Sequence, residues 1–464
     1  MLSVVGIVLA LGGLIVLAYR GLSVLLLAPL AALVAVLMTP DTPVLASYTQ
    51  VFMKALGGFV VLYFPLFMLG ALFGKLMEAS GAARVLALAI VRRLGAGQAI
   101  LAVTLACALL TYGGVSLFVV AFAVYPIAAE LFRQADVPKR LVPATIALGA
   151  FTFTMTALPG TPAIQNAIPM PFFGTTPFAA PGLGVLAGAV MLGGGLLWLT
   201  WRHRQARLGG EGYGQHDEQG LGTPTTSTEH DLPVIAAVTP IVSVVLLNLV
   251  VGEWWLPRLD TSYLAAALYG ETQLGAVRGV WAIIVALSLS IVLLLGLAWR
   301  QLPRGWAVYN AGVAASVMPI FNTASLVGFG AVVASLAGFE LIRDAILGVG
   351  GSNPLISLAI VVNVLAGITG SASGGMSIAL QAMGDDYLAM GREQGFAPDL
   401  LHRVTSIATG GLDALPHNGA VITLLEICKL THRQSYLDIA VVAVGVPLFA
   451  LAVVIGLGTA FGSF

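Results

Sequence analysis

Two proline-containing stretches, "TALPGTPAIQNAIPMP" (156–171) and "LDALPHNGAVITLL" (412–425), interrupt otherwise apolar segments of this chain. The first contains four prolines, a glycine and several polar side chains. Proline breaks a helix, and non-helical backbone at membrane depth is tolerated only where protein buries it or where it lines a water-filled cavity. Both stretches therefore predict broken helices that line a site.

The composition places these stretches in a membrane. Hydrophobic residues make up 58% of the 464 residues and charged residues only 9%, against about 25% charged residues in soluble domains. The apolar residues also fall in blocks of about 17–25, a length that crosses a hydrocarbon core of ~30 Å. The sequence predicts an all-α polytopic membrane protein. The lipid bilayer is its expected partner, and a net charge of zero gives no indication of nucleic-acid binding.

A polar segment rich in Gly and Thr, 202–231, divides the chain near its middle. It predicts a solvated linker between a first repeat, 1–201, and a second, 232–464, each with scaffold helices of its own. Lys and Arg cluster around this linker and the apolar segments before it, which places the linker in the cytoplasm. About ten crossings and two hairpins then leave both termini outside the cytoplasm and give the two halves opposite orientations. The linker histidines, His203, His216 and His230, do not have a metal-binding spacing.

Each half contains a long apolar block with a Gly-Gly break, followed by a helix broken at Leu-Pro. Ala157-Leu158-Pro159 can be aligned with Ala414-Leu415-Pro416. Gly114 precedes Pro159 by 45 residues, and Gly375 precedes Pro416 by 41. This spacing predicts two re-entrant hairpins and two broken helices. The expected bounds are 98–131 for the cytoplasmic-side hairpin, 143–170 for its broken helix, 354–390 for the outer-side hairpin and 401–428 for the second broken helix.

Inverted repeats with discontinuous helices are the architecture of secondary transporters, and the helix ends at such breaks suit a small organic anion. Hydroxyl and backbone N–H groups at the tips and breaks fit a hydroxy acid. The tip glycines have an alternative role, which is close helix packing. The candidate substrate-binding residues are Thr111, Tyr112, Gly113, Gly114, Ser116, Thr156, Gly160, Thr161, Asn166, Ser371, Ser373, Gly374, Gly375, His417 and Asn418.

Ionisable residues inside spans are rare and usually functional. Asp413 and His417 lie in the second break. Both are candidate proton-coupling residues, with Asp413 as the proton acceptor and His417 as a partner for Asp413 or for a substrate carboxylate. The alternative is that Asp413 caps the following helix and that His417 is a neutral, hydrogen-bonded residue.

The sequence contains no HExxH, GxSxG or Walker A motif. We therefore expect no enzymatic activity, no catalytic residues, no metal and no cofactor other than a coupling ion.

Four stretches resemble the GntP family of gluconate-type permeases, which belongs to the ion transporter superfamily. They are "FPLFMLGALFGKLMEASGAA" (64–83), "LTYGGVSLFVVAFAVYPIAAELF" (110–132), "FTFTMTALPGTPAIQNAIPMPFFGT" (151–175) and the second proline stretch. The resemblance covers nearly the whole chain apart from the linker. The Tyr-Gly-Gly and Leu-Pro-Gly-Thr-Pro sequences are its most specific parts.

The resemblance implies a homodimer in the bacterial inner membrane, with a scaffold domain and a transport domain that moves as an elevator. It also implies proton-coupled uptake of gluconate or of a shorter hydroxy acid such as 3-hydroxybutyrate. The hairpin tips lack the Ser-Asn-Thr signature of the sodium-coupled dicarboxylate relatives, which favours protons over Na⁺. A sodium-coupled carboxylate or dicarboxylate symporter and an uncoupled anion channel or facilitator are the alternatives.

Overall fold

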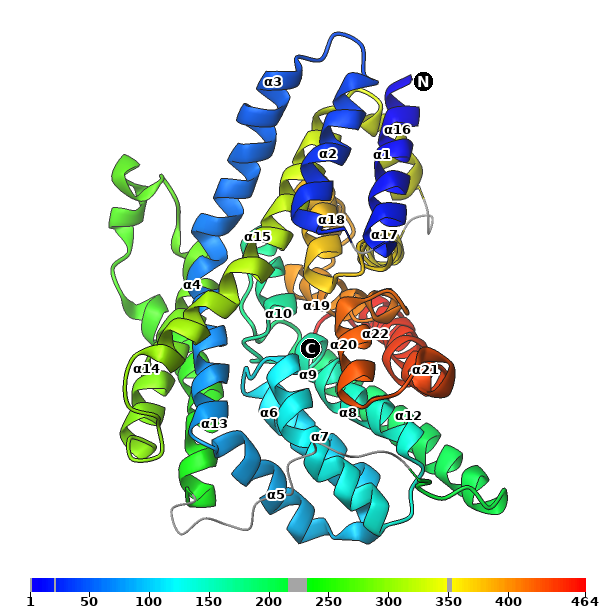
Figure 1. Ribbon diagram of the computed structural model, residues 1–464. Coiled ribbons are helices and arrows are strands. Elements are labelled where there is room, and N and C mark those ends of the chain that lie inside the picture. The colour runs from blue at the N-terminus through cyan, green and yellow to red at the C-terminus, as the bar shows by residue number, and fades with distance from the viewer. Residues whose placement is uncertain (1, 21, 216–231, 349–352) are drawn as a thin grey trace.

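The computed structural model describes residues 2–20, 22–215, 232–348 and 353–464, and within these ranges all regular structure is helical (Figure 1). By length and composition, seven described helices can cross a membrane, or eight if a pair bent by 102° counts as one span. That pair is Ala82–Leu94 with Ala96–Tyr112. The expected all-helical, multi-pass class is confirmed. Six of these helices match crossings expected from the sequence, and the seventh, Leu117–Gln134, lies in the expected first hairpin. The other four expected crossings are α1, Leu2–Tyr19, and α2, Val24–Leu37, which are short for a full crossing, and the two broken helices, whose helical pieces are shorter still.

The long helices form most of the molecule. Several are extended by π-helical or 3₁₀ turns, and helices α3 to α4, α13 to η5 and α21 to α22 are each continuous. Their bounds are α3 Val44–Ala46, η1 Ser47–Phe52, α4 Met53–Ala79, α12 Pro181–Leu208, α13 Val234–Leu249, η4 Val250–Trp255, η5 Leu256–Arg258, α14 Leu274–Leu297, α15 Ala307–Ser335, α21 His432–Ala440, η9 Val441–Gly445 and α22 Val446–Phe461.

Helices α4 and α15 pack closely against each other (Figure 1). Each has a proline inside it, Pro65 in α4 and Pro319 in α15. A Cβ on Gly312 would lie 3.1 Å from the Cα of Leu72, so glycine lets the two backbones approach. A short helix follows each of the pair, α5 Ala82–Leu94 after α4 and α16 Phe339–Leu347 after α15.

Two helical hairpins follow these helices in the chain. The first consists of α6, Ala99–Tyr112, and α7, Leu117–Gln134, and the second of α17, Pro354–Thr369, and α18, Ala372–Glu393. The helices of each hairpin pack against one another. The first tip abuts α13, and the second abuts α15.

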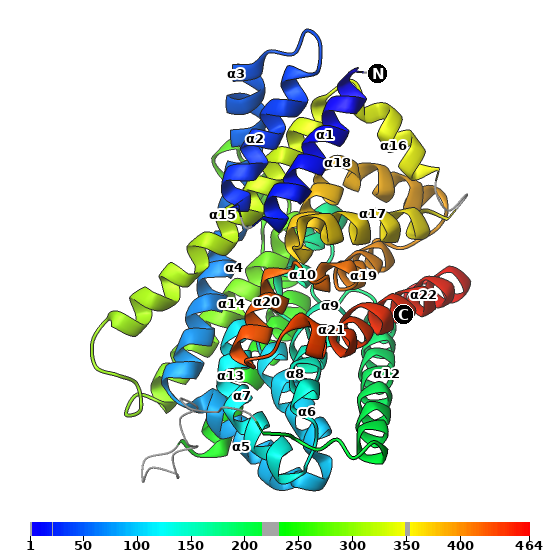
Figure 2. The ribbon, with the colours of Figure 1, turned by 45° about the vertical axis from the view of Figure 1, so that its right-hand side comes forward.

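Short helices separated by irregular backbone follow each hairpin. They gather near the centre of the molecule in both views, and the proline stretches lie between them (Figures 1 and 2). After the first hairpin they are η3 Lys139–Leu141, α8 Val142–Ala150, α9 Phe153–Thr156, α10 Ile164–Ala167 and α11 Pro169–Phe173. After the second they are α19 Pro398–Thr409, η8 Leu412–Ala414 and α20 Gly419–Ile427. Short 3₁₀ turns complete the fold, η2 Ala96–Gln98, η6 Ser262–Ala265 and η7 Ala267–Tyr269.

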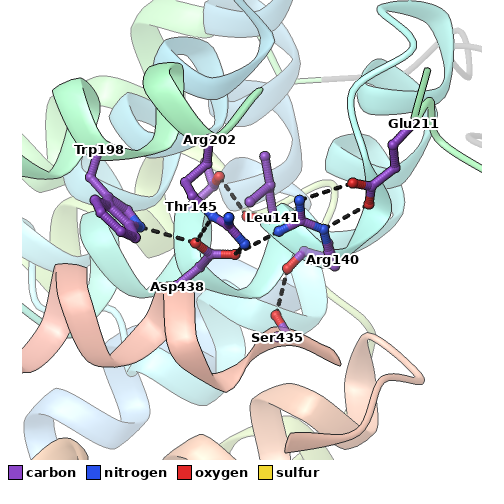
Figure 3. Close-up of polar contacts among 8 residues, drawn as sticks. All are labelled: Arg140, Leu141, Thr145, Trp198, Arg202, Glu211, Ser435 and Asp438. Carbon is purple, nitrogen blue, oxygen red and sulfur yellow. Dashed lines mark hydrogen bonds and ion pairs between the residues drawn. The ribbon is translucent and has the colours of Figure 1, made fainter. Parts of the chain in front are cut away.

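A buried ionic cluster joins α12, η3 and α21 (Figure 3). The carboxylate of Asp438, only 1% exposed, accepts hydrogen bonds from Trp198, Arg202 and Arg140 at 3.0, 2.7 and 3.0 Å. Arg140 also forms two hydrogen bonds to Glu211, and these hold the pKa of the Glu211 carboxyl below its usual range. The two arginines are balanced by two carboxylates, so the cluster fastens segments that are distant in sequence.

The position of this ionic cluster shows that the predicted start of the linker was wrong. The solvated linker was predicted to begin at 202, but α12 continues to Leu208, because Arg202 is anchored by Asp438. The chain beyond the helix also packs, since the backbone N–H of the buried Tyr213 donates to Asp136. His203 is half-buried on α12 rather than solvated. The rest of the predicted linker, 216–231 with His216 and His230, lies outside the described residues.

Candidate functional site

The first helix break turns at Gly160. Its φ of +81° is in the left-handed region, which glycine adopts without strain. Its N–H donates to the carbonyl of Pro177, and its own carbonyl accepts from Nδ2 of Asn248 on α13 at 3.2 Å. The freed backbone groups are thus paired with a neighbouring loop and a neighbouring helix, as burial in a membrane protein requires.

Asn166, in α10, closes this break. Its Nδ2 donates to the carbonyls of Thr161 and Pro177 at 3.1 and 2.9 Å. Its Oδ1 accepts from Nε2 of His402 and from Arg403, both on α19. Nε2 of His402 therefore carries the proton, and in the neutral ring Nδ1 accepts from the hydroxyl of Thr175 at 2.6 Å. The amide of Asn166 is thus engaged entirely within the protein.

Arg403 brings a positive charge to the first break. The side chain is completely buried, and Nε and one terminal nitrogen donate to the carbonyl of Ala179 at 3.0 and 2.6 Å. Weaker bonds reach the carbonyls of Thr156 and Pro177 at 3.4 Å. All of these acceptors are neutral, and within the described ranges no carboxylate lies at ion-pair distance from Arg403. The centre of the protein therefore holds a guanidinium whose hydrogen-bond acceptors are all neutral, and the carboxylate of Asp399, four residues earlier on α19, acts on it only at longer range.

Arg403 and His402 were not among the site residues predicted from the sequence. Both lie inside the segment 401–428 that it assigned to the second broken helix. The signal was present, since charged residues within an apolar span are rare. The predicted residues of this segment lie around Leu415-Pro416, however, whereas Arg403 and His402 bond to Asn166 in the first half of the chain.

The first hairpin tip is tied to the first break. The hydroxyl of Tyr112 donates to the carbonyl of Pro159 at 2.7 Å. The hydroxyl of Thr111 is buried, whereas Ser116 is exposed at the start of α7. This contact brings the predicted tip and the predicted break together in space.

Two threonines at the break that were predicted to bind substrate form hydrogen bonds with neighbouring groups of the protein. The hydroxyl of Thr156 donates to the carbonyl of Thr152, and its own carbonyl accepts from Ser406 at 2.8 Å. Oγ1 of Thr161 accepts from the N–H of Ala163 at 3.3 Å, so it stabilises the turn before α10. Both side chains are completely or almost completely buried.

The second break is tied to the second tip in a similar way. Nε2 of His417 lies 3.0 Å from the carbonyl of Gly367, and Nδ2 of Asn418 donates to the carbonyl of Gly370 at 2.9 Å. Oδ1 of Asn418 accepts from the N–H groups of Ala420 and Val421 and so caps α20. Asp413, half-buried on η8, is therefore not the cap of this helix.

Hydroxyl groups at the second tip contact one another. Ser371 caps α18 by accepting from the N–H of Gly374 at 3.1 Å. Its hydroxyl lies 3.4 Å from that of Ser373, which in turn lies 3.2 Å from the hydroxyl of Thr323 on α15. The tip is thereby connected to the long helix beside it.

Packing and turn geometry account for the tip glycines. A Cβ on Gly113 would clash with Ile241 of α13, one on Gly374 would clash with Leu326, and one on Gly375 would clash with the backbone of Ala366. Gly114 differs from these because its φ of +91° requires glycine at the turn. All four glycines thus have a structural explanation, which was the alternative left open by the sequence.

Comparison with known proteins identifies relatives of this chain. It is 45% identical over 447 residues to YxjC of Bacillus subtilis (strain 168), described as an uncharacterized transporter. The match covers 93% of this chain and 94% of that protein. No family model matches the chain. Among solved structures, the YdaH transporter of Alcanivorax borkumensis is similar in fold, with a TM-score of 0.51, 13% identity and coverage of 97% and 98% of the two chains.

Proposed function

We propose that this chain, which belongs to the transporter family that includes YxjC of Bacillus subtilis, is a secondary transporter that carries a small hydroxy-monocarboxylate together with a proton. In this proposal the residues of the two tips and breaks bind the acid and move with it across the membrane, and the acid is not chemically changed. The resemblance to GntP permeases supplies the substrate class, gluconate-type sugar acids or shorter hydroxy acids. It also supplies the expected setting, a homodimer in the bacterial inner membrane.

The observation that carries this proposal is the buried guanidinium of Arg403 at the first helix break. A buried charge is costly unless it is paired, and here every hydrogen-bond acceptor is neutral. Its bonds to carbonyl groups satisfy its N–H donors but leave the positive charge in place. A carboxylate entering beside the break would complete the pair, so an anion is the substrate class that this centre favours.

The proposed transport mechanism is alternating access by an elevator motion of two inverted repeats. The order of the elements supports this proposal, because a long proline-containing helix, a short helix, a hairpin and a broken helix occur in that order in each half. The direct packing of α4 on α15 and of α12 on α22 also supports it, since equivalent helices meet at a pseudo-twofold axis.

The proposed proton carrier is Asp413. It is half-buried on η8 at the second break, close in sequence to His417, and a carboxylate in such a place exchanges protons with either side as the site changes access. His417 and Asn418 hold this break against the second tip. A proton on Asp413 would then alter the charge of the region that moves.

Uptake of labelled gluconate and labelled 3-hydroxybutyrate into proteoliposomes tests the proposal. An inward proton gradient is imposed first and an inward sodium gradient second. Uptake of one acid driven by the proton gradient alone is the expected result. Uptake driven by sodium alone would favour the sodium-coupled alternative, and entry of the acid down its own gradient regardless of either ion would favour a facilitator. Empty liposomes provide the control.

A further inference from the structure

Three buried polar groups around the first break have no hydrogen-bond partner within the described part of the chain. They are Oγ1 of Thr111, Oε1 of Gln165 and Oδ1 of Asn248. The three residues are 3%, 8% and 1% exposed. Buried polar atoms in native proteins are nearly always paired, so three unpaired ones in one region call for an explanation.

The contacts of their neighbours bring these residues to one place. The amide nitrogen of Asn248 donates to the carbonyl of Gly160, and Gln165 lies five residues further along the same break. The bond from Asn166 to the carbonyl of Thr161 closes that segment into a compact turn.

Thr111 reaches the same region from the hairpin tip. It precedes Tyr112, whose hydroxyl bonds to the carbonyl of Pro159, directly before Gly160. A Cβ on Gly114 would lie 3.0 Å from the ring of Pro162. The tip and the break therefore meet along the stretch that also carries Gly160.

The orientation of the Asn248 amide is fixed by its other bond. Because its nitrogen donates to the carbonyl of Gly160, a flipped amide would place two oxygens together. Its oxygen is consequently an acceptor that needs a donor. The buried oxygen of Gln165 also lacks a donor within the described residues, although no bond fixes its amide as one does for Asn248, and the hydroxyl of Thr111 can donate or accept.

The positive charge of Arg403 determines which kind of group can pair with these two amide oxygens. Arg403 bonds to Asn166, the residue next to Gln165 in α10. Its positive charge disfavours a metal cation at amide oxygens so close by, and an O–H group satisfies them without adding positive charge. Tyr112, Gly114, Pro159 and Pro162, where the tip meets the break, are partly exposed residues, so this region is not sealed on all sides.

We propose that Gln165 and Asn248 accept hydrogen bonds from hydroxyl groups of the transported acid, with Thr111 as a third member of this hydroxyl-binding subsite. The inference rests on the proposed function, because it takes the ligand to be the transported hydroxy acid. The carboxylate lies toward Arg403 and the carbon chain toward Gln165 and Asn248. The subsite makes the transporter select acids with hydroxyl groups on the chain over acids of equal length without them.

Paired ligands test this subsite. Binding to the purified full-length protein is measured by calorimetry for gluconate and hexanoate, and for 3-hydroxybutyrate and butyrate. A site that hydrogen-bonds a hydroxyl discriminates against the analogue that lacks it. We expect the hydroxylated member of at least one pair to bind about tenfold to hundredfold more tightly.

Three variants assign the selectivity to the subsite: Gln165→Met, Asn248→Leu and Thr111→Val. We expect the first two to reduce the ratio of affinities within the pair by about tenfold and Thr111→Val to reduce it less. Thr104→Val is the matched control, because Thr104 on α6 has an equally buried hydroxyl that finds no partner among the described residues, about two turns from the tip. It should leave the ratio unchanged.

The outcomes separate this inference from the proposed function. Equal binding of both members of each pair by the unchanged protein would overturn the subsite while leaving carboxylate transport standing. Unchanged ratios in folded Gln165→Met and Asn248→Leu proteins would overturn the assignment to these residues. Binding of none of the four acids would instead contradict the proposed function. Monodispersity of each variant on size exclusion verifies that it is folded.

Discussion

A terminal nitrogen of Arg403, on α19, lies 3.2 Å from Oδ1 of Asn166, on α10. The second half of the chain thus supplies the positive charge at the helix break of the first half. The same arginine bonds to the carbonyls of Thr156 and Ala179, which lie before and after that break. One side chain therefore both fixes the path of the broken helix and gives it a charge.

Replacing Arg403 separates these two roles. We expect Arg403→Gln to lose the charge and most of the fork of donors, and to lower uptake more than tenfold. Arg403→Lys retains the charge but has three donors on one nitrogen, so it should fold less stably yet keep measurable uptake. Thermal unfolding and initial uptake rates of the purified variants measure both effects. Uptake by Arg403→Gln at the rate of the unchanged protein would show that no anion depends on this charge.

Asp413→Asn tests proton coupling. The amide cannot carry the proton, so uptake driven by an imposed pH gradient should be abolished. Exchange of internal unlabelled acid for external labelled acid at equal pH needs no net proton movement and should persist. Asp386→Asn, on α18, is a control with a carboxylate outside the break. A pH-driven uptake in Asp413→Asn like that of the unchanged protein would exclude Asp413 as the carrier.

Tyr112→Phe removes the bond between the first tip and the first break without changing the ring. Loss of one hydrogen bond to the carbonyl of Pro159 costs about 1 kcal/mol. We expect a several-fold weaker apparent affinity for the acid, with the protein still folded. Tyr125→Phe is the control, because its hydroxyl bonds to the carbonyl of Cys428 away from the break. An equal effect of both substitutions would mean that the contact of Tyr112 is only structural.

Asp438→Asn tests the ionic cluster at the junction of α12, η3 and α21 (Figure 3). The substitution leaves two arginines beside a neutral amide, and breaking a buried ion pair costs about 3–5 kcal/mol. We expect a clearly lower unfolding temperature. Glu211→Gln removes a more exposed partner of Arg140, and the expected loss is about 1 kcal/mol or less. Equal unfolding temperatures for the two variants would contradict this view of the cluster.

Much of the fold follows from patterns that the sequence displays directly. Apolar blocks longer than 18 residues have few alternatives to membrane helices, and Pro159 and Pro416 cannot continue a helix in which each would need a backbone N–H. The first turn and both breaks therefore lie close to the predicted positions, whereas the second turn falls at Gly370 and Ser371, and Gly374 and Gly375 lie inside the first turn of α18. The start of the linker was misplaced because the polar residues after Trp201 look solvated until their partner Asp438, more than 200 residues away, is known.

The candidate site was harder to predict, because its decisive contacts cross between the halves. Asn166 was selected as a substrate ligand, yet its amide is occupied by His402, Arg403 and two carbonyls. Asn248 lies in an apolar run of α13, where hydrogen bonding between helices is the ordinary role of an asparagine, and its nitrogen does bond to the carbonyl of Gly160. Its oxygen has no hydrogen-bond partner among the described residues, and this could not be predicted from the sequence because it depends on which side chains surround the amide in three dimensions.

The most direct measurement of proton-coupled anion transport follows the pH inside proteoliposomes, with a trapped dye, as the acid enters without an imposed ion gradient. The readout uses the impermeant gluconate anion, with empty liposomes and Arg403→Gln proteoliposomes beside the unchanged protein. The lumen should acidify as labelled acid accumulates, and neither signal should appear with Arg403→Gln. Accumulation of the acid with a constant internal pH would contradict proton symport, even if the acid binds at the proposed site.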